Sequence, residues 1–350
     1  MIPSTARLAL LMHGHLRVRQ GKMGFGLLRY GTHEVVAVID REHVGGSLHA
    51  LTGIAHGAPI VGSAAEAAAL GADTLVLAVA TSGGVLPDDF RSEIVVGLAA
   101  GMSLVNGLHG TYAVDPQFTA VLQPGANIFD VRLEPAGLRP GRGLAASVRA
   151  RRVLTVGTDM AIGKMTASLE LHRAALARGY SSHFIATGQI GICIAGEGVP
   201  LDAVRVDFAS GSVEQLVMKH GDAHDVLWVE GQGSILHPSS TAWLPLLRGS
   251  MPTDLVLVHR AGQTHVLNID GFAVPPLPEV IALYEAVASG GGSFPAAKVR
   301  AVALNCAHLA DLDEVRAACG EVEDATGLPC EDVVRFGADR LLDALELGRG

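Results

Sequence analysis

The chain has 350 residues, of which 49% are hydrophobic and 17% charged, and its formal net charge is −9. This length accommodates two domains with well-filled cores. The negative charge argues against a general nucleic-acid or anionic-membrane partner, and no uncharged, glycine-free apolar run reaches the ~18 residues that a transmembrane helix requires.

The residue types favour layered α/β structure in a reduced compartment. Glycine is abundant, with 43 copies, while aromatic residues make up only 4% of the chain, a balance that suits many tight turns between strands and helices. The start of the chain lacks the basic region and cleavage site of a signal peptide and resembles a first strand. The cysteines form no CxxC motif, so we expect a cytoplasmic protein with buried thiols rather than a catalytic one. They are Cys193, Cys306, Cys319 and Cys330.

The first half of the chain alternates short apolar runs with helical patterns. Ser63 and Glu66 have the spacing of a capping box at a helix start, and the nearly continuous apolar run at 73–80 is typical of a strand buried on both faces. This alternation predicts a parallel, Rossmann-like sheet. The predicted strands are 6–12, 34–39, 73–80 and 103–106, and the predicted helices are 63–70 and 88–100.

A second series of strands and helices follows a connector at 132–150 that is rich in Gly, Pro and Arg. We predict an α/β chain of two domains, a Rossmann-like domain over 1–140 and a P-loop NTPase-like, doubly wound parallel-sheet domain over 150–350. The strands predicted in the second series are 152–156, 182–186, 225–229, 254–259 and 299–305, and the helices are 164–179, 212–220 and 277–288.

A phosphate-binding loop is predicted between the strand at 152–156 and the helix that begins at Lys164. The local sequence is VGTDMAIGKMT. Unpaired N–H groups at a helix start, together with the helix dipole, attract phosphate, and the lysine adds a compact positive charge. The residues expected to bind the cofactor are Gly157, Thr158, Asp159, Ile162, Gly163, Lys164, Met165 and Thr166.

The residue after the lysine departs from the common pattern G-x4-G-K-[ST]. Met165 stands where nucleotide hydrolases place a serine or threonine that ligates Mg²⁺. Methionine sulfur is a poor ligand for this hard cation, and Thr166 lies one residue further round the helix. The loop therefore favours phosphate binding over ATP hydrolysis.

A carboxylate follows the apolar run at 225–229. Ligands of doubly wound sheets bind beyond the carboxyl ends of the strands, so Glu230 should face the same crevice as Lys164. It is our first candidate for a general base, and for a Mg²⁺ ligand if that metal is used; a structural role in the following turn is the alternative. Gln232 is a candidate substrate ligand and His237 a second base, unless it is a solvated surface group. With Lys164, these two bases form the predicted catalytic set.

Two further segments should open onto this crevice. Gln189, after the strand at 182–186, could bind a substrate carboxylate or serve only its own turn. Arg260 is suited to bidentate carboxylate binding, and His265 follows it on the same segment, although a surface salt bridge is the alternative for this pair. No zinc-ligand spacing and no G-x-S-x-G elbow occurs, so no metal is predicted apart from the Mg²⁺ alternative.

The segments GTDMAIGKMT, ATGQIG, VEGQGSILHP and HRAGQTH resemble, in the same order, a two-domain P-loop family catalogued as a domain of unknown function. This resemblance implies a Rossmann-like N-terminal domain and a dethiobiotin-synthetase-like C-terminal domain. Some members are D-amino-acid N-acetyltransferases that act on D-glutamate with acetyl-CoA. Segments 59–66, 71–77 and 101–107 more weakly resemble the CoA-binding domain of acyl-CoA synthetases, which leaves open which domain holds CoA.

The leading hypothesis is therefore transfer of acetyl from acetyl-CoA to the amine of a small acidic amino acid, with D-glutamate as the first candidate. An ATP- and Mg²⁺-dependent ligase or kinase of the dethiobiotin-synthetase type is the first alternative, and a non-catalytic CoA or nucleotide sensor is the second. A nicotinamide oxidoreductase has less support, because Gly24 and Gly26 do not form a G-x-G-x-x-G motif after a strand. Only small-molecule ligands and a homodimer or higher homo-oligomer are expected as partners.

Overall fold

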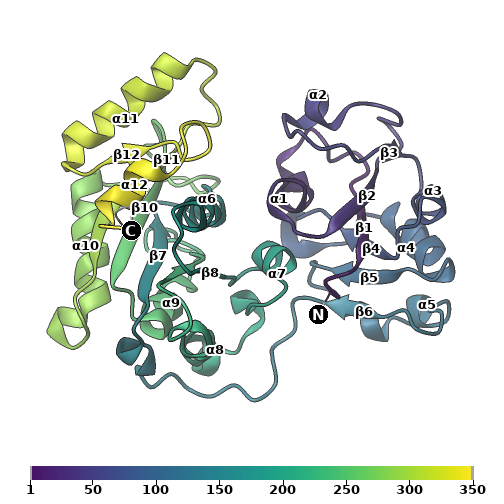
Figure 1. Cartoon of the computed structure of the whole chain (residues 1–350), viewed down its shortest axis with the longest axis horizontal. Coiled ribbons are helices and arrows are strands. Elements are labelled where there is room, and N and C mark those ends of the chain that lie inside the picture. The colour runs from purple at the N-terminus through teal and green to yellow at the C-terminus, as the bar shows by residue number, and fades with distance from the viewer. Residues whose placement is uncertain (1, 348–350) are drawn as a thin grey trace. The chain divides into compact units, whose positions relative to one another are not determined.

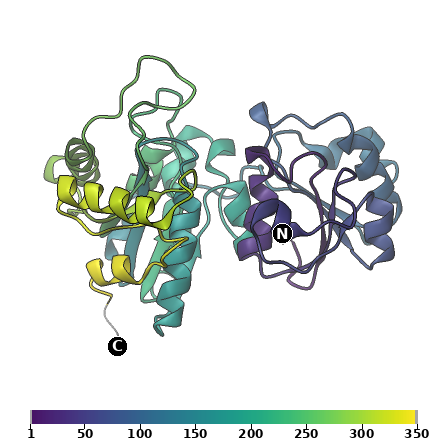
Figure 2. The same cartoon turned by 90° about the horizontal axis from the view of Figure 1, so that it is seen from above.

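The computed structural model describes residues 2–347 and divides them into two compact units. The first unit contains the chain up to Glu134 together with the segment 189–203, and the second contains 135–188 and the chain from Val204 onward. Each unit is a parallel sheet with helices on both faces (Figures 1 and 2). No helix of the described chain is long and apolar enough to cross a membrane.

The sheet of the first unit has six parallel strands in the order β3-β2-β1-β4-β5-β6. This order reverses direction between β1 and β4, as in dinucleotide-binding Rossmann folds, and confirms the predicted Rossmann-like architecture. The strands are β1 (Arg7–Leu11), β2 (Glu34–Ile39), β3 (Ile60–Val61), β4 (Thr74–Leu77), β5 (Ser103–Asn106) and β6 (Ile128–Asp130). The helices are α1 (Lys22–Tyr30), α2 (Leu48–Thr52), α3 (Ala64–Ala69), α4 (Phe90–Ala99), α5 (Pro116–Thr119) and α7 (Gln189–Ala195).

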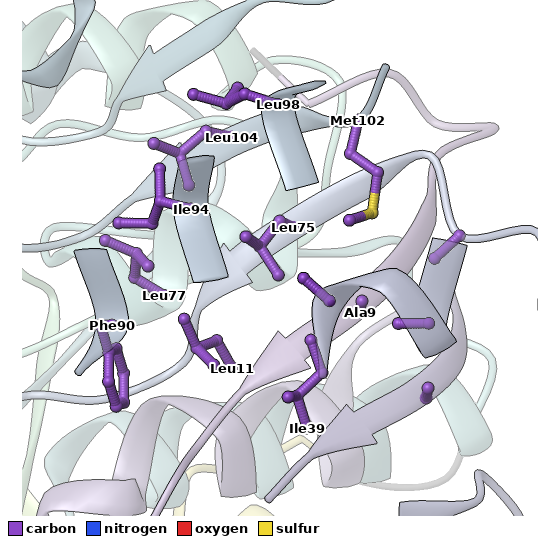
Figure 3. Packing of buried hydrophobic residues seen from close by; sticks show 14 of the residues in the cluster. Ala9, Leu11, Ile39, Leu75, Leu77, Phe90, Ile94, Leu98, Met102 and Leu104 are labelled. Carbon is purple, nitrogen blue, oxygen red and sulfur yellow. The ribbon is translucent and has the colours of Figure 1, made fainter. Parts of the chain in front are cut away.

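The core between this sheet and α4 follows from the alternation of side chains along a strand. Every second residue of the central strands points to one face, where it meets the apolar stripe of α4 (Figure 3). The contributing side chains include Ala9, Leu11, Ile39, Leu75, Leu77 and Leu104 from the strands and Phe90, Ile94 and Leu98 from α4.

The predicted capping box is present at the start of α3. The backbone N–H of Glu66 donates to Ser63 Oγ, and the Ser63 hydroxyl donates to Glu66 Oε1. The other carboxylate oxygen accepts the N–H of Gly62, one residue before the cap. One donor that the helix start leaves unpaired, the Glu66 N–H, and one donor of the preceding turn are satisfied in this way.

Helix α7 departs from the prediction, which made its sequence a loop after a strand. Gln189 is its first residue, and the helix packs against α1 within the first unit. Its buried residues Ile190, Cys193 and Ile194 are apolar, and covering them requires an apolar partner. A segment from the second half of the sequence thus completes the core of the first unit.

The second unit has a six-stranded parallel sheet in the order β12-β11-β10-β7-β9-β8. The strand that feeds the predicted phosphate loop, β7, is central, with β10 on one side and β9 on the other. The strands are β7 (Arg151–Gly157), β8 (Ser182–Ile185), β9 (Val226–Val229), β10 (Asp254–Arg260), β11 (Lys298–Asn305) and β12 (Cys330–Glu331). The helices are α6 (Lys164–Ala177), α8 (Val206–His220), α9 (Trp243–Ser250), α10 (Leu277–Ser289), α11 (Leu312–Thr326) and α12 (Asp339–Ala344).

The connector after the first unit is irregular apart from a 3-10 turn at Leu144–Ser147. One of its anchors is a buried carboxylate, since Glu214 on α8 accepts the backbone N–H groups of Arg142 and Leu144. Charge-assisted bonds of this kind are among the stronger hydrogen bonds. Helix α8 also begins six residues before the predicted start at Ser212, and its first turns lie beside this connector.

Candidate functional site

The phosphate loop joins the carboxyl end of β7 to the start of α6. Gly163 occupies the N-cap position of α6 with φ of 112°, a backbone conformation that favours glycine. Among the described residues no side chain caps this helix start, and its first turn contains no acidic residue. The N–H groups of the first turn, which have no intrahelical partner, are therefore available to an anionic ligand.

Three side chains outside the loop hold it in place, two through its backbone carbonyls and one through the Thr158 hydroxyl. The Tyr284 hydroxyl donates to the carbonyl of Gly157 at 2.8 Å, and Asn305 Nδ2 donates to the carbonyl of Ile162 at 2.7 Å. His259 Nδ1 shares a 2.9 Å hydrogen bond with the Thr158 hydroxyl, and burial lowers the pKa of this histidine to about 4, so it is neutral. Because these contacts order the loop before a ligand binds, binding costs little conformational entropy.

Lys164 is 5% exposed, and its ammonium donates to the backbone carbonyl of Asp159, within its own loop, at 2.7 Å. Burial lowers the pKa of Lys164 to about 8, while the charges of Asp159 and Glu230 act in the opposite direction. The ammonium form is therefore the majority species at neutral pH. Burial removes the water that would otherwise bond this ammonium, and an anionic ligand beside it would take the place of that water.

Glu230 lies directly after β9 and is 3% exposed. Its Oε2 accepts the backbone N–H groups of Thr187 at 2.8 Å and Gly188 at 3.1 Å. Burial raises the pKa of Glu230 to about 7, even though these donors, the Gln232 side chain and Lys164 favour the charged form. A carboxylate with a pKa near neutrality has the strength expected of a general base.

The glycine after this carboxylate brings β9 and β7 into unusually close contact. Gly231 N–H donates to the hydroxyl of Thr155 at 3.0 Å. A Cβ at position 231 would collide with the backbone oxygen of Thr155 and lie 2.9 Å from Lys164 Cδ. Only glycine lets the acidic strand end approach the phosphate loop this closely.

Asp159 uses its carboxylate to hold a neighbouring loop. It accepts the backbone N–H groups of Met160 at 2.6 Å and Leu267 at 2.8 Å, and the Gln263 amide at 2.6 Å. The amide oxygen of Gln263 is buried without a hydrogen-bond partner within the described chain. That oxygen is a ready acceptor for a ligand N–H group beside the phosphate loop.

His237 is 6% exposed, so the alternative of a solvated surface histidine does not hold. Its Nδ1 accepts the backbone N–H of Ser239, and its Nε2 lies 4.0 Å from Asp159 Oδ1. In the neutral ring, Nδ1 uses its lone pair to accept this bond and the proton lies on Nε2. The ring then has no free lone pair with which to take a proton from a substrate. The geometry therefore favours Glu230 over His237 as the base.

The remaining predicted residues occupy different places. Gln232 hydrogen-bonds Glu230, and Arg260 ends β10, the strand beside β7, with no ion pair to any described residue. His265 is exposed, and its Nδ1 contacts the Thr264 hydroxyl. Gln189 belongs to the first unit, where it packs beside Gly107. Met165 and Thr166 are partly buried in the first turn of α6.

Several residues that support the loop are absent from the predicted set. Asn305 ends β11 and His259 stands next to the end of β10, so the rule that ligands bind at carboxyl ends of strands could have identified them. Tyr284 lies on α10, far along the chain from the loop, and no local pattern marks it. Its role depends on tertiary packing alone.

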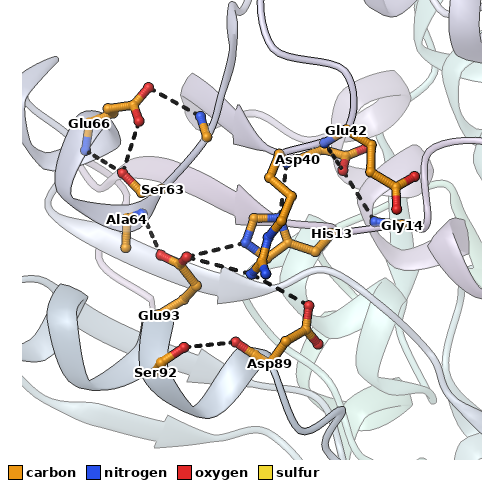
Figure 4. Close-up of polar contacts among 12 residues, drawn as sticks. His13, Gly14, Asp40, Glu42, Ser63, Ala64, Glu66, Asp89, Ser92 and Glu93 are labelled. Atoms are coloured by element: carbon orange, nitrogen blue, oxygen red, sulfur yellow. Dashed lines mark hydrogen bonds and ion pairs between the residues drawn. The ribbon is translucent and has the colours of Figure 1, made fainter.

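The first unit also has polar residues at the carboxyl edge of its sheet (Figure 4). His13 accepts the N–H of Arg41 at Nδ1 and contacts Glu93 through Nε2 at 3.3 Å. The second Glu93 oxygen accepts the N–H of Ala64, and Asp40 accepts the N–H of Gly14. These side chains bond to one another and tie four segments of the unit together. The residues around the phosphate loop of the second unit remain our candidates for the reaction centre.

Comparison with known proteins supports both parts of this description. A Rossmann-like domain model named DUF1611_N, a domain of unknown function, matches residues 41–134, and the P-loop domain model DUF1611_C matches residues 139–342. A crystal structure of a DUF1611 family protein from Anabaena variabilis is 56% identical, with a TM-score of 0.95 over 98% of this chain and 100% of that one.

Two relatives carry functional names. A protein of Tritonibacter scottomollicae named D-glutamate N-acetyltransferase is 39% identical over 80% of this chain and 83% of its own length. A Pseudoalteromonas protein with the same name is 34% identical over the same shares of the two chains. The Rossmann-like sheet, the P-loop sheet and these matches lead to one conclusion: the chain belongs to the DUF1611 family.

Proposed function

We propose that this protein is an N-acetyltransferase that moves the acetyl group of acetyl-CoA to the amine of a small acidic amino acid, with D-glutamate as the first candidate. The observation that carries the proposal is Glu230, a buried carboxylate whose pKa burial raises to about 7, beside the lysine of a phosphate loop. The names of the two relatives support the same activity.

The loop has the chemistry required to hold the phosphates of CoA. The start of α6 is uncapped, and the buried ammonium of Lys164 supplies a positive charge next to it. Met165 follows the lysine and offers no oxygen to a Mg²⁺ ion. This combination suits an anchor for a phosphate chain that remains intact during the reaction.

The amine must lose a proton before it can attack a carbonyl group. Glu230 in its charged form would take that proton from the substrate ammonium, and the buried amide oxygen of Gln263 would accept an N–H of the same group. Arg260, which has no ion pair within the described residues, would bind a substrate carboxylate. Acetyl-CoA supplies a thioester, so the new N–C bond forms as the C–S bond breaks and the CoA thiolate leaves and is protonated.

The direct test is a product assay on the full chain. The protein is incubated with acetyl-CoA labelled with ¹³C in the acetyl group and with D-glutamate, and N-acetylglutamate is measured by mass spectrometry while a thiol reagent follows CoA release. We expect labelled product and thiol in equal amounts. L-glutamate, D-aspartate and D-glutamine define the preference for chirality and charge.

A variant tests the role of the loop lysine. Lys164→Met should raise the KM for acetyl-CoA by 10-fold or more, on the order of one lost charge-assisted contact.

Absence of acetylated product across this panel would exclude the proposal. Parallel incubation with ATP and Mg²⁺ separates the alternatives, because a ligase or kinase releases ADP when its acceptor is present. Tight CoA binding without turnover of any acceptor would instead identify a CoA sensor.

A further inference from the structure

Three histidines of the second unit come together away from the candidate reaction centre. His183 is the second residue of β8, His220 is the last residue of α8, and His224 lies in the turn between α8 and β9. One ligand nitrogen from each can be chosen so that all three lie within 4.8 Å of one another. We propose that this cluster binds one divalent transition-metal ion of the zinc type, held by three imidazole nitrogens, with water in the fourth position.

One nitrogen of each ring is already near the spacing that a metal site requires, since the three lie within 4.8 Å of one another. Zinc binds imidazole nitrogen at about 2.0–2.1 Å, so a tetrahedral ion holds its ligand atoms roughly 3.3 Å apart. The ring centroids of His183 and His224 are 4.9 Å apart and those of His220 and His224 are 5.8 Å apart, while the rings of His183 and His220 are stacked at 3.8 Å, so that their in-plane lone pairs run side by side. Binding therefore requires the stacked rings to rotate out of parallel, so that their lone pairs converge on the ion.

The His224 ring is oriented by a backbone group. Its Nδ1 lies 3.0 Å from the carbonyl oxygen of His220, and a carbonyl can only accept, so this nitrogen carries the proton. In the neutral ring the basic lone pair is then on Nε2. Metal-bound histidines commonly donate their second nitrogen to a carbonyl or carboxylate in this way, which fixes the tautomer.

The surroundings favour a cation of intermediate softness. His220 ends a helix of 15 residues, and the carboxyl end of a helix carries partial negative charge. Imidazole ligands suit zinc, nickel and copper, whereas calcium and magnesium require oxygen ligands, and the cluster contains no carboxylate. All three histidines are partly buried, so the site combines protection with access from solvent.

The topology separates this cluster from the phosphate loop. Ser182, next to His183, pairs with Val226 of β9, which also pairs with Arg151 at the start of β7. The phosphate loop follows the opposite end of β7, a strand of seven residues or about 20 Å. The ion would therefore lie at the amino edge of the sheet and take no part in acyl transfer. It would fasten the edge strand β8 to the end of α8.

The test uses the full chain after chelator treatment and buffer exchange. Calorimetric titration with Zn²⁺ should show one bound ion per chain, and zinc at a hundredfold excess over its Kd should raise the Tm of the transition it stabilises by roughly 5–10 °C. Titration with Co²⁺ should produce the intense visible absorption of tetrahedral nitrogen coordination. Absence of that absorption, or of zinc binding, in the wild-type chain would overturn the proposal.

Matched variants assign the site. His183→Ala and His224→Ala should each weaken zinc binding by about 10-fold or more, whereas His49→Ala, which removes an exposed histidine of α2 in the first unit, should leave it unchanged. Circular dichroism establishes that each variant is folded. Zinc binding that survives both cluster substitutions, or falls equally in His49→Ala, would contradict the assignment. Acetylation of D-glutamate by chelator-treated His224→Ala is expected to match that of chelator-treated wild type, so this proposal and the proposed function can fail separately.

Discussion

Glu230 shows how much of a residue's chemistry depends on its surroundings. An exposed glutamate has a pKa near 4.3 and is a weak base at neutral pH. Here burial raises the pKa to about 7, while the N–H groups of Thr187 and Gly188 and the ammonium of Lys164 keep the charged form accessible. The same environment lowers the pKa of Lys164 to about 8. Because the two pKa values shift in opposite directions, Glu230 and Lys164 are both mainly charged only in a narrow pH range, between about 7 and 8.

These shifts predict a bell-shaped dependence of kcat/KM on pH. Activity should rise as pH increases through about 7, because Glu230 must lose its proton to act as a base, and it should fall above about 8 as Lys164 loses its charge.

Glu230→Gln keeps an oxygen for the two backbone donors but cannot accept the proton, so we expect kcat/KM to fall 10²–10⁴-fold, the usual contribution of a general base.

Steady-state rates over a range of pH check this prediction. The residual activity of Glu230→Gln should lack the rise near pH 7 but keep the fall above pH 8. His237→Gln serves as the comparison, because the geometry assigns the proton transfer to Glu230; its profile should retain both limbs. A rise near pH 7 that persists in Glu230→Gln would show that another group takes the proton.

At the scale of elements, the site depends on how three strand ends meet. β9 and β10 flank β7, so Glu230 and Arg260 emerge on either side of the phosphate loop. Gly231 allows β9 to approach β7, and Tyr284 and Asn305 from more distant elements fix the loop carbonyls. Each of these contacts joins segments that are far apart in the sequence, and together they preorganise the anion cradle.

Gly231→Ala tests the close approach. Its new methyl group would meet the Thr155 carbonyl, so the strand end must shift; we expect a loss of about 1–3 kcal/mol in the free energy of unfolding and a large loss of activity. The matched control is Gly320→Ala, in the interior of α11, where an added Cβ has open space. It should increase stability by about 0.5–1 kcal/mol through helix propensity. Urea denaturation measures both values, and a neutral Gly231→Ala variant would refute this role for the glycine.

At the scale of the whole molecule, the two units are not two consecutive pieces of chain. The segment 189–203 leaves the second unit, completes the first through α7, and returns. Its apolar residues Ile190, Cys193 and Ile194 are buried against partners that include α1. The first unit therefore depends on a segment from the second half of the sequence for its integrity.

This arrangement predicts that the second half of the chain does not behave as an independent domain. A fragment of residues 135–350 would expose the apolar face of α7, so we expect it to bind a hydrophobic dye and to aggregate, whereas the intact chain should bind little dye and elute as one discrete species. The same fragment with Ile190→Ser and Ile194→Ser should bind less dye. Dye fluorescence and size-exclusion chromatography check this, and a monomeric wild-type fragment that binds no dye would contradict it.

Local patterns were sufficient for the architecture and for the phosphate loop. The buried apolar runs and their alternation with helices predict two parallel sheets, because a parallel strand is covered on both faces and a helix must cross between strands. The GTDMAIGKMT segment predicts a strand, a loop and a helix start, since only such an arrangement aims several backbone N–H groups at one anion. The capping box at Ser63 is equally local, because both partners lie within one helical turn.

Other features were decided only by the tertiary structure. The apolar character of Ile190 and Ile194 is visible in the sequence, but which surface covers them is not, so α7 could not be placed with the first unit. The sequence contains no sign that Tyr284 reaches the Gly157 carbonyl, or that His183 meets His220 and His224. The pKa values of Glu230 and Lys164 depend on burial among groups from several strands. Hydrogen bonds, burial and charge act over a few ångströms in space, and only the folded chain determines which distant residues come within that range.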